Sequence, residues 1–217
     1  MIVVVCNIKG GTGKSCLSQN IAISLQLNHS KNVLLVDADP QGTTADWVQE
    51  RKLSSQLADI NCIQLKGNIR SELLEFESSF DVIIVDCGGH DSEAMRSAMS
   101  AATHILIPFR AKRRDLKLLP QISDVVNLVK IVNEDVRINS IITQAPSLPN
   151  QVTRILDAKK ACLSFDIPPL RALTYQRNVY DDADESGSSV FEYKIKGNMT
   201  DEKAIEEIEN IVSEFIT

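Results

Sequence analysis

A short glycine-rich segment near the start of the chain, KGGTGKS at residues 9–15, carries the residue types of a phosphate-binding loop. It stands between a strand-like apolar run and a stretch with helical periodicity. Glycines at such a junction let backbone N–H groups turn inward around phosphate oxygens, and the following helix N-terminus adds positive potential. Lys14 is expected to reach the β- and γ-phosphates, and Ser15 to offer its hydroxyl to Mg²⁺. The segment departs from the usual G-x-x-x-x-G-K-[ST] spacing, because Ile8 replaces the first glycine, and it carries a second lysine, Lys9.

Three aspartates stand at the ends of strand-like runs and are candidates for the metal side of the same site. VLLVDADPQG contains Asp37 and Asp39, and DVIIVD ends in Asp86. The carboxyl ends of parallel strands meet at the edge where such sheets bind ligands. Because Mg²⁺ takes oxygen ligands and keeps several waters, we expect Asp86 to hold it through water and Asp37 to support the same shell. Asp39, directly before Pro40, could also be only a turn former.

The pattern of the chain predicts the scaffold that must position these residues. Short, continuously apolar runs alternate with longer stretches of helical periodicity, as in a parallel sheet covered by helices on both faces. The predicted strands are 2–6, 32–37, 60–65, 81–86, 104–109, 138–143 and 168–173. The predicted helices are 14–28, 42–55, 68–77, 91–101, 114–132, 149–163 and 200–216. We therefore expect one α/β domain over residues 1–217, built on a mostly parallel, twisted sheet.

The last predicted helix is amphipathic, and its polar face is acidic. Thr200 is the predicted N-cap, and the apolar residues of one face are Ile205, Ile208, Val212 and Phe215. Lys203 is its only base, whereas a helix that lies on a membrane surface is normally basic. We therefore expect this helix to dock on the core.

Composition excludes several classes of protein. The formal net charge is −6 and the pI is about 5.1, so a global attraction to nucleic acid is not expected. The five cysteines form no CxxC pair and fit reduced thiols better than a disulfide framework. No apolar run approaches the ~20 residues of a membrane span, and no signal segment opens the chain. We expect a cytoplasmic protein without membrane association.

A local basic cluster interrupts this acidic background. It comprises Arg110, Lys112, Arg113, Arg114 and Lys117, with Asp115 among them. A solvated helix start accounts for the cluster, and so does a surface that contacts DNA phosphates without sequence preference. Positive charge at a helix N-terminus opposes the helix dipole, which disfavours a purely structural origin.

The segment KGGTGKS matches the deviant Walker A motif, K-G-G-x-G-K-[ST], and the chain thereby resembles the ParA/MinD superfamily of P-loop ATPases. VLLVDADPQG resembles the A′ motif of that family, and FDVIIVDCGG its Walker B strand. The resemblance implies ATP and Mg²⁺ as cofactors, and it makes Asp39 the residue that orients or activates the attacking water. The nucleotide-binding residues it implies are Lys9, Gly10, Gly11, Thr12, Gly13, Lys14, Ser15 and Cys16, where the family usually has threonine in place of the cysteine.

The family signature gives the second lysine a role. The resemblance implies a homodimer that sandwiches ATP, with Lys9 reaching the phosphates held by the other subunit. A cation there would stabilise the charge that develops as the γ-phosphate leaves. From the residues alone, a solvated loop lysine remains the alternative.

Two further segments, 104–119 and 175–192, resemble small plasmid-partition ATPases of the ParF type, although those relatives have a proline-rich stretch where this chain has 111–114. The resemblance implies slow hydrolysis, nonspecific DNA binding by the ATP dimer, nucleoid association in that state, and stimulation by a ParB-like centromere-binding partner. Arg177 and Asn178 are candidates to contact adenine or the second subunit. The alternatives are a MinD-like membrane-cycling ATPase, a positioning factor for another cargo, and a metabolic P-loop ligase, which has no need of Lys9.

Overall fold

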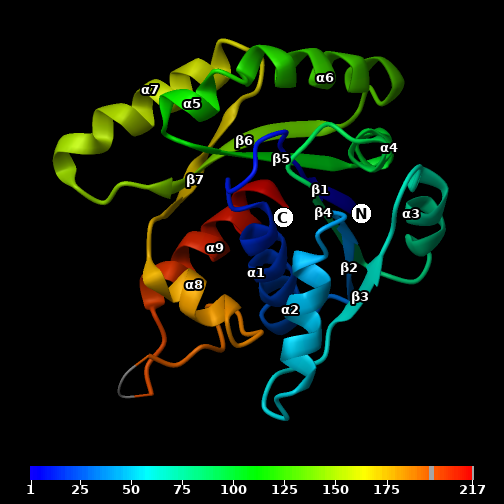
Figure 1. The fold of residues 1–217 in the computed structure, drawn as a ribbon, viewed down its shortest axis with the longest axis vertical. Helices are drawn as coiled ribbons and strands as arrows, with labels where there is room; N and C mark the ends of the chain where they lie inside the picture. Colours follow the sequence, from blue (N-terminus) through cyan, green and yellow to red (C-terminus); the bar gives the residue numbers. More distant parts are fainter. Residues whose placement is uncertain (196–197, 217) are drawn as a thin grey trace.

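The structure is a computed structural model that describes residues 1–195 and 198–216. In this part of the chain seven strands form one sheet in the order β3-β2-β4-β1-β5-β6-β7, and every strand pairing in it is parallel. Figure 1 shows the sheet between two layers of helices, which confirms the predicted fold class. The strands are β1 (Ile2–Val5), β2 (Val33–Ala38), β3 (Asn61–Gln64), β4 (Val82–Cys87), β5 (His104–Arg110), β6 (Arg137–Ala145) and β7 (Pro169–Tyr175).

The central strands are buried on both faces. Every residue of β1, β2 and β4 is buried, which explains why their sequences are continuously apolar up to the aspartates. Successive residues of one strand point to opposite faces. Accordingly, Ile2 and Val4 belong to one hydrophobic cluster, and Val3 and Val5 to the other.

Helices cover each face of the sheet (Figure 1). One layer packs over the cluster that contains Val4, and the other packs over the cluster that contains Val3. The first layer consists of α3 (Arg70–Phe76), α4 (Glu93–Ala101), α5 (Arg113–Leu116), α6 (Leu119–Val132) and α7 (Val152–Leu163), with the short η1 (Pro149–Gln151) before α7. The second layer consists of α1 (Lys14–Leu27), α2 (Thr43–Lys52), α8 (Asn178–Asp184) and α9 (Glu202–Phe215). None of the described helices is both long and apolar enough to cross a bilayer.

The structure divides one predicted helix and adds one that was not predicted. The segment predicted as one helix, 114–132, is divided into α5 and α6, because Pro120 falls in the first turn of α6 and cannot continue a preceding helix. The helix α8 was not predicted at all. It is seven residues long and rich in acidic residues, and it is held to the core by Val179, Tyr180 and Ala183.

The terminal helix α9 packs against α1 and β7, and its apolar face is buried. The prediction that Thr200 caps this helix was wrong. Asp201 is the N-cap, and its Oδ1 accepts hydrogen bonds from the backbone N–H groups of Lys203 and Ala204 at 3.1 and 3.2 Å. Asp is at least as good an N-cap as Thr, so the helix begins one residue later than its pattern indicates.

Candidate functional site

The glycine-rich loop connects β1 to α1 at the carboxyl edge of the sheet. Gly11 and Gly13 have φ values of 71° and 87°, a region that glycine enters at little cost. The Thr12 carbonyl accepts a hydrogen bond from the Thr143 hydroxyl of β6 at 2.7 Å, which ties the loop to a neighbouring strand. Lys14 Nζ folds back and donates to the Lys9 carbonyl at 3.2 Å. The loop is therefore ordered by its own contacts.

A cavity of about 490 Å³ opens over this loop. Its floor contains loop residues and the first turn of α1, including Lys14 and Ser15. Asp39 contributes from the segment after β2, and Gly89 from the segment after β4. The fold thus brings six of the eight predicted nucleotide-binding residues, all but Lys9 and Thr12, to one cavity with the predicted water-orienting aspartate.

Asp86 lies at the end of β4, beside Val5 of β1 and Asp37 of β2 in the sheet register, and is fully buried. Its Oδ2 accepts a hydrogen bond from the Thr44 hydroxyl at 2.7 Å. Its Oδ1 makes no hydrogen bond of sound geometry with any residue that the structure describes, although Ser15 lies close enough to favour the ionised carboxylate. Burial raises the pKa of Asp86 to about 7, against the opposing effect of the Thr44 hydrogen bond.

An unpartnered, buried carboxylate oxygen close to the loop serine fits a magnesium site. Mg²⁺ takes oxygen ligands, often one or two carboxylates together with waters and phosphates. Ser15 and Asp86 supply such oxygens here. A cation beside Asp86 would also offset the cost of ionising a buried carboxylate.

Asp37 has a different environment from the one predicted for a metal-shell residue. Its two oxygens accept backbone hydrogen bonds, from Asp39 N at 3.0 Å and from Ala45 N at 2.8 Å. Burial raises its pKa, and these hydrogen bonds act in the opposite direction. Asp37 therefore fixes the start of α2, which carries Thr44, and in this structure it supports Asp86 through that helix.

Asp39 forms the predicted turn and also reaches the cavity, where its role in orienting water stays a prediction. Its Oδ1 accepts a hydrogen bond from Gln41 N at 3.0 Å, which forms a local turn. The same residue also lines the cavity over the loop. The segment after β4 packs closely here, because a Cβ on Gly88 would lie 3.2 Å from Asp39 Oδ1, and a Cβ on Gly89 would lie 2.9 Å from the Cα of Gly10.

Comparison with known proteins assigns the family. The model of the CobQ/CobB/MinD/ParA nucleotide binding domain matches residues 3–196. The chain belongs to this family. The predicted membership of the ParA/MinD superfamily is thereby confirmed.

Named relatives include a carboxysome distribution protein and a sporulation inhibitor. The Maintenance of carboxysome distribution protein A of Halothiobacillus neapolitanus is 29% identical over 216 residues, which cover 98% of this chain and 94% of that protein. The sporulation initiation inhibitor protein Soj of Bacillus subtilis is 26% identical over 180 residues, which cover 65% of this chain and 71% of Soj.

Solved structures show the same fold at low identity. An ATP complex of a Cyanothece McdA variant superposes with a TM-score of 0.77 at 16% identity and covers 98% of this chain and 95% of that chain. The MinD cell division protein of Aquifex aeolicus superposes with a TM-score of 0.67 at 18% identity and covers 100% of this chain and 98% of that chain.

Lys9, the signature residue of this ParA/MinD-family chain, does not take part in its own phosphate site through any contact that the structure describes. Its backbone N–H donates to Asn7 Oδ1 at 2.9 Å, and its carbonyl accepts from Lys14. No hydrogen bond or ion pair of its ammonium group is found within residues 1–195 and 198–216.

Cys16, the departure from the family pattern, lies in surroundings that favour the neutral thiol. Burial raises its pKa to about 12, and the nearby carboxylates of Asp184 and Asp181 act in the same direction. Its position in the first turn of α1 does not produce a thiolate. It lies between two cavities and lines both of them.

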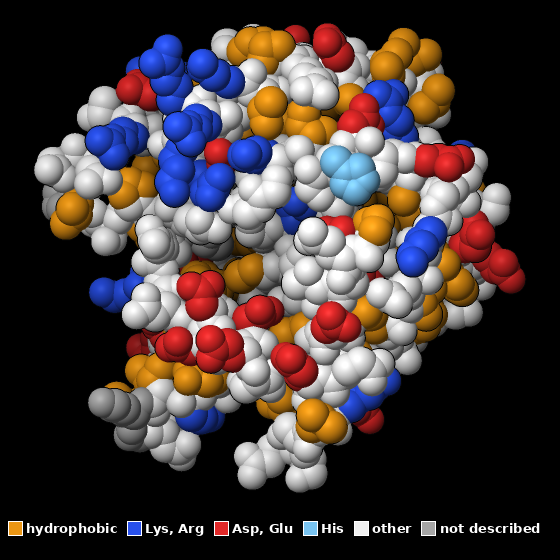
Figure 2. All heavy atoms as spheres, in the orientation of Figure 1, with side chains coloured by type: hydrophobic (Ala, Val, Ile, Leu, Met, Phe, Trp, Pro, Cys, Tyr) orange, Lys and Arg blue, Asp and Glu red, His pale blue; other side chains and the backbone are white. Residues whose placement is uncertain are grey.

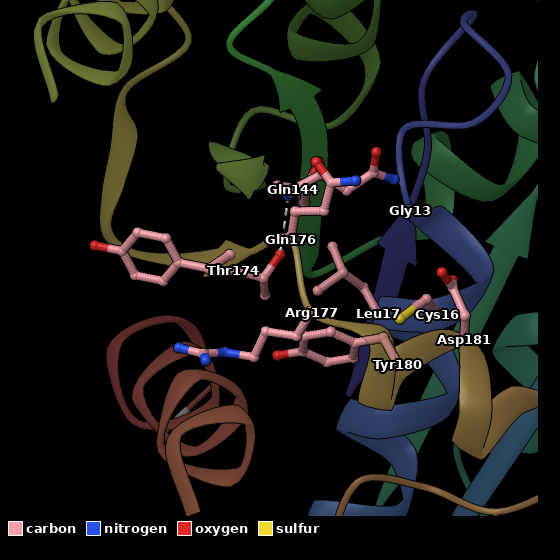
Figure 3. Close-up of a pocket in the computed structure, with 11 residues that line it drawn as sticks. Gly13, Cys16, Leu17, Gln144, Thr174, Gln176, Arg177, Tyr180 and Asp181 are labelled. Atoms are coloured by element: carbon pink, nitrogen blue, oxygen red, sulfur yellow. Dashed lines mark hydrogen bonds between the residues drawn. The ribbon is translucent and has the colours of Figure 1, made fainter. Parts of the chain in front are cut away.

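A second, smaller cavity of about 150 Å³ adjoins the first, and the two share Gly13, Cys16, Gln144 and Asp181. Figure 3 shows its lining, which comes from the phosphate loop and the start of α1, the ends of β6 and β7, and α8. Gln144 was not predicted as a site residue. It has a positive φ of 48°, and its amide Nε2 donates to the Gly11 carbonyl at 3.3 Å. Its place directly after the predicted strand 138–143 was the signal that could have identified it.

Arg177, a candidate to contact adenine or the second subunit, lines the second cavity but does not direct its charge there. Its guanidinium is paired with Glu207 of α9, with Nη2 and Oε1 2.6 Å apart. In Figure 3 the side chain runs from the end of β7 toward α9. Contact of Arg177 with adenine or with a second subunit stays a prediction.

The basic cluster divides into two parts. Arg110 is held by the buried Asp115, with Nε 2.7 Å from Oδ2, and its Nη1 lies 3.7 Å from the Cβ position of Gly11. The other four members are exposed and form no ion pair with the residues that the structure describes; they are Lys112, Arg113, Arg114 and Lys117. Arg154 of α7 flanks the same groove as three of them. Figure 2 shows basic side chains gathered over α5 and α7.

Proposed function

We propose that the chain is a Mg²⁺-dependent ATPase that dimerises around bound ATP and uses the dimer to position a cargo on DNA. The observation that carries the proposal is the pairing of a lysine- and serine-bearing phosphate loop with the unpartnered, buried oxygen of Asp86. A glycine-rich turn without nucleotide chemistry would not need a buried carboxylate whose ionisation is so costly.

The roles within one subunit follow from the site. The loop N–H groups and Lys14 bind the phosphates, and Ser15 and Asp86 hold Mg²⁺. The metal, when bound, neutralises charge on the β- and γ-phosphate oxygens. Asp37 holds the start of α2 in place, and Asp39 at the cavity orients the attacking water.

Lys9 completes the phosphate site of the other subunit. Its ammonium has no partner among the described residues of its own chain, so it is available to a second copy. A cation supplied in this way makes hydrolysis depend on dimerisation, and loss of the γ-phosphate removes the bridge between subunits.

The dimer binds DNA through the four exposed cations of 112–117, and nonspecific binding of this kind places the ATP state on the nucleoid. A ParB-like partner stimulates slow hydrolysis and releases the dimer. For the cargo, the chromosome partitioning protein ParA of Myxococcus xanthus and a virulence plasmid ParA family protein of Chlamydia trachomatis support chromosome or plasmid partition. The carboxysome distribution relatives match 98% and 90% of this chain, and they support a protein assembly as the second candidate cargo.

Two rival functions are less well supported. A MinD-like membrane cycle needs a membrane-binding surface, and the apolar face of α9 is buried in the core. A metabolic ligase shares the fold, as the likeness to a cobyrinic acid a,c-diamide synthase at a TM-score of 0.68 illustrates. A ligase gives no role to Lys9, and it would release little phosphate from ATP without a second substrate.

The deciding experiment measures molecular mass in solution with Mg²⁺ and either a non-hydrolysable ATP analogue or ADP. Wild type is expected to double its mass only with the triphosphate analogue, and Lys9→Ala to stay monomeric. Lys31→Ala, which removes an exposed lysine elsewhere, is the control and should behave as wild type. If Lys9→Ala dimerises and hydrolyses ATP as wild type does, the proposal of a lysine acting across the interface is overturned.

A further inference from the structure

Glu207 of α9 is a buried carboxylate that the phosphate site does not use. Its side chain is 9% exposed. Its Oε1 accepts a hydrogen bond from Arg177 Nε at 2.7 Å, and its Oε2 accepts from the Tyr180 hydroxyl at 2.8 Å and from the Tyr175 N–H at 3.1 Å. All three donors line the second cavity. One carboxylate therefore holds three separate parts of that cavity wall.

The second cavity is the place for a nucleobase if the phosphates occupy the loop. It adjoins the phosphate cavity at Gly13 and Cys16 and is lined by backbone and by side chains of mixed polarity. Its volume is only about 150 Å³. Because the space is small, a modest movement of one wall changes what fits in it.

The contacts of Glu207 also determine where the two side chains point. Arg177 lies over the ring of Tyr175, with its Cζ 5.6 Å from the ring centroid. Tyr180 donates its hydroxyl to α9, and burial together with the Glu207 charge raises its pKa, so that it remains a donor. In Figure 3 both side chains lie between the cavity and α9.

We propose that Glu207 is a positioning residue through which α9 sets the affinity and base preference for nucleotide. It holds Arg177 and Tyr180 in the orientation that shapes the base cavity. This inference rests on the proposed function, because it requires nucleotide in the neighbouring phosphate loop. It concerns the base alone, so binding of the phosphates should not depend on it.

The test compares ATP with inorganic triphosphate, which has the phosphates but no base. Glu207→Gln keeps the shape and an acceptor oxygen but loses the ion pair with Arg177. The matched control is Glu206→Gln, an exposed neighbour on the same helix. Calorimetry measures the affinities for Mg-ATP, for Mg-ITP (inosine triphosphate, which carries a different base) and for inorganic Mg-triphosphate. Tm is recorded for each variant.

Glu207→Gln is expected to bind ATP about tenfold more weakly, the effect of one charge-assisted hydrogen bond. Its affinity for triphosphate should equal that of wild type, and its preference for ATP over ITP should fall. Glu206→Gln should change neither. A purely structural role would lower Tm and weaken ATP and triphosphate together, which would overturn the inference.

A second variant keeps the test informative if Glu207→Gln does not fold. Tyr180→Phe removes a single hydroxyl hydrogen bond and retains the ring, and it should weaken ATP binding but not triphosphate binding. If wild type binds ATP and both Glu207→Gln and Tyr180→Phe bind it equally well, this inference alone is overturned. If wild type binds neither ATP nor triphosphate, the proposed function is overturned, and this inference with it.

Discussion

At the scale of single residues, Asp86 is a carboxylate whose ionisation the folded protein opposes. An exposed aspartate has a pKa of about 3.9, and burial raises that of Asp86 to about 7. Between these values the folded protein holds a proton that the unfolded chain has lost. The contribution of Asp86 to stability is therefore most favourable at low pH, and it declines as the pH rises through this window.

In metal-free protein, the free energy of unfolding of wild type relative to Asp86→Asn should fall between about pH 5 and pH 7. We expect a change on the order of 1–3 kcal/mol. Urea unfolding of both proteins in EDTA across this range measures it. Mg-ADP should make the free energy of unfolding of wild type less dependent on pH over this range, because Mg²⁺ binds the ionised form of Asp86. Parallel pH profiles for the two proteins would contradict the prediction.

Gly89 permits the segment after β4 to lie directly on the phosphate loop. In Gly89→Ala the new Cβ would meet backbone atoms of Gly10 at 2.9 and 3.0 Å, so one of the two segments must move. We expect ATP affinity to fall by about tenfold or more while Tm changes little, since both segments lie at the sheet edge. Gly88→Ala is the graded comparison, because its Cβ would meet side-chain atoms of Asp39 at 3.2 Å, and side chains can yield. An equal loss in both variants would show that backbone crowding is not the cause.

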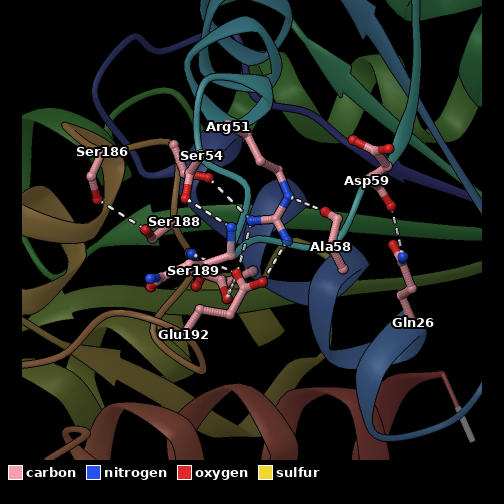
Figure 4. A network of polar contacts seen from close by, with 12 residues as sticks. Gln26, Arg51, Ser54, Ala58, Asp59, Ser186, Ser188, Ser189 and Glu192 are labelled. Atoms are coloured by element: carbon pink, nitrogen blue, oxygen red, sulfur yellow. Dashed lines mark hydrogen bonds and ion pairs between the residues drawn. The ribbon is translucent and has the colours of Figure 1, made fainter. Parts of the chain in front are cut away.

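At the scale of elements, α2 connects the nucleotide site to the segment that precedes α9. Thr44 at its start contacts Asp86, and Arg51 near its end is 1% exposed. Figure 4 shows the guanidinium of Arg51, which donates to the Ala58 carbonyl at 2.6 Å and to Glu192 Oε2 at 2.8 Å. Gly187 is also required in this network, because a Cβ there would lie 2.3 Å from Arg51 N.

Arg51→Met should destabilise the protein by about 2–4 kcal/mol, because it leaves the largely buried Glu192 carboxylate with only the hydrogen bonds from Ser189. The neighbouring Lys52 is exposed, and Lys52→Met is the control, expected to change stability by less than about 0.5 kcal/mol. Urea unfolding gives both values. Similar stabilities for the two variants would mean that the Arg51–Glu192 ion pair adds no net stability, because its attraction only offsets the cost of removing both groups from water.

Elements differ in how far their sequences reveal them. The strands β1, β2 and β4 were predictable because burial on both faces demands unbroken apolar runs that stop where the site begins. The helix α8 was not, because its few apolar residues are outnumbered by polar ones and its packing decides its conformation. Glu207 was hidden for another reason. In the sequence Glu207 is one of several acidic residues in a predicted helix. Only the fold brings it to Arg177, which lies 30 residues away in the sequence.

At the scale of the whole molecule, charge is distributed unevenly around the nucleotide cavities. Figure 2 shows basic side chains over α5 and α7, whereas acidic ones lie over α8 on the same face. A chain with a net charge of −6 repels DNA at long range, so binding must depend on the local basic surface.

If 112–117 binds DNA phosphates, removing its four exposed cations should weaken DNA binding by the ATP-bound protein and flatten its salt dependence. The slope of log K against log salt should decrease by up to about 4 per subunit, since each phosphate contact contributes about 0.9. The charge-matched control replaces four exposed lysines elsewhere, namely Lys31, Lys66, Lys130 and Lys203. Fluorescence anisotropy over a salt series measures the DNA affinity and its salt dependence. Equal slopes for the two variants would show that this surface does not bind DNA.

The position of β1 in the sheet has a consequence for how the chain is made. It is synthesised before every other strand, yet it lies between β4 and β5 and cannot be covered until both have left the ribosome. At ~5–20 residues per second, the wait for β4 alone is roughly 4–15 s, during which an entirely apolar strand has no neighbour. Asp86 arrives at the end of β4, so a nascent chain cannot complete the proposed metal site before the first partner of β1 has been made. Nucleotide can therefore stabilise the finished sheet, but it cannot assist the earliest stage of its assembly.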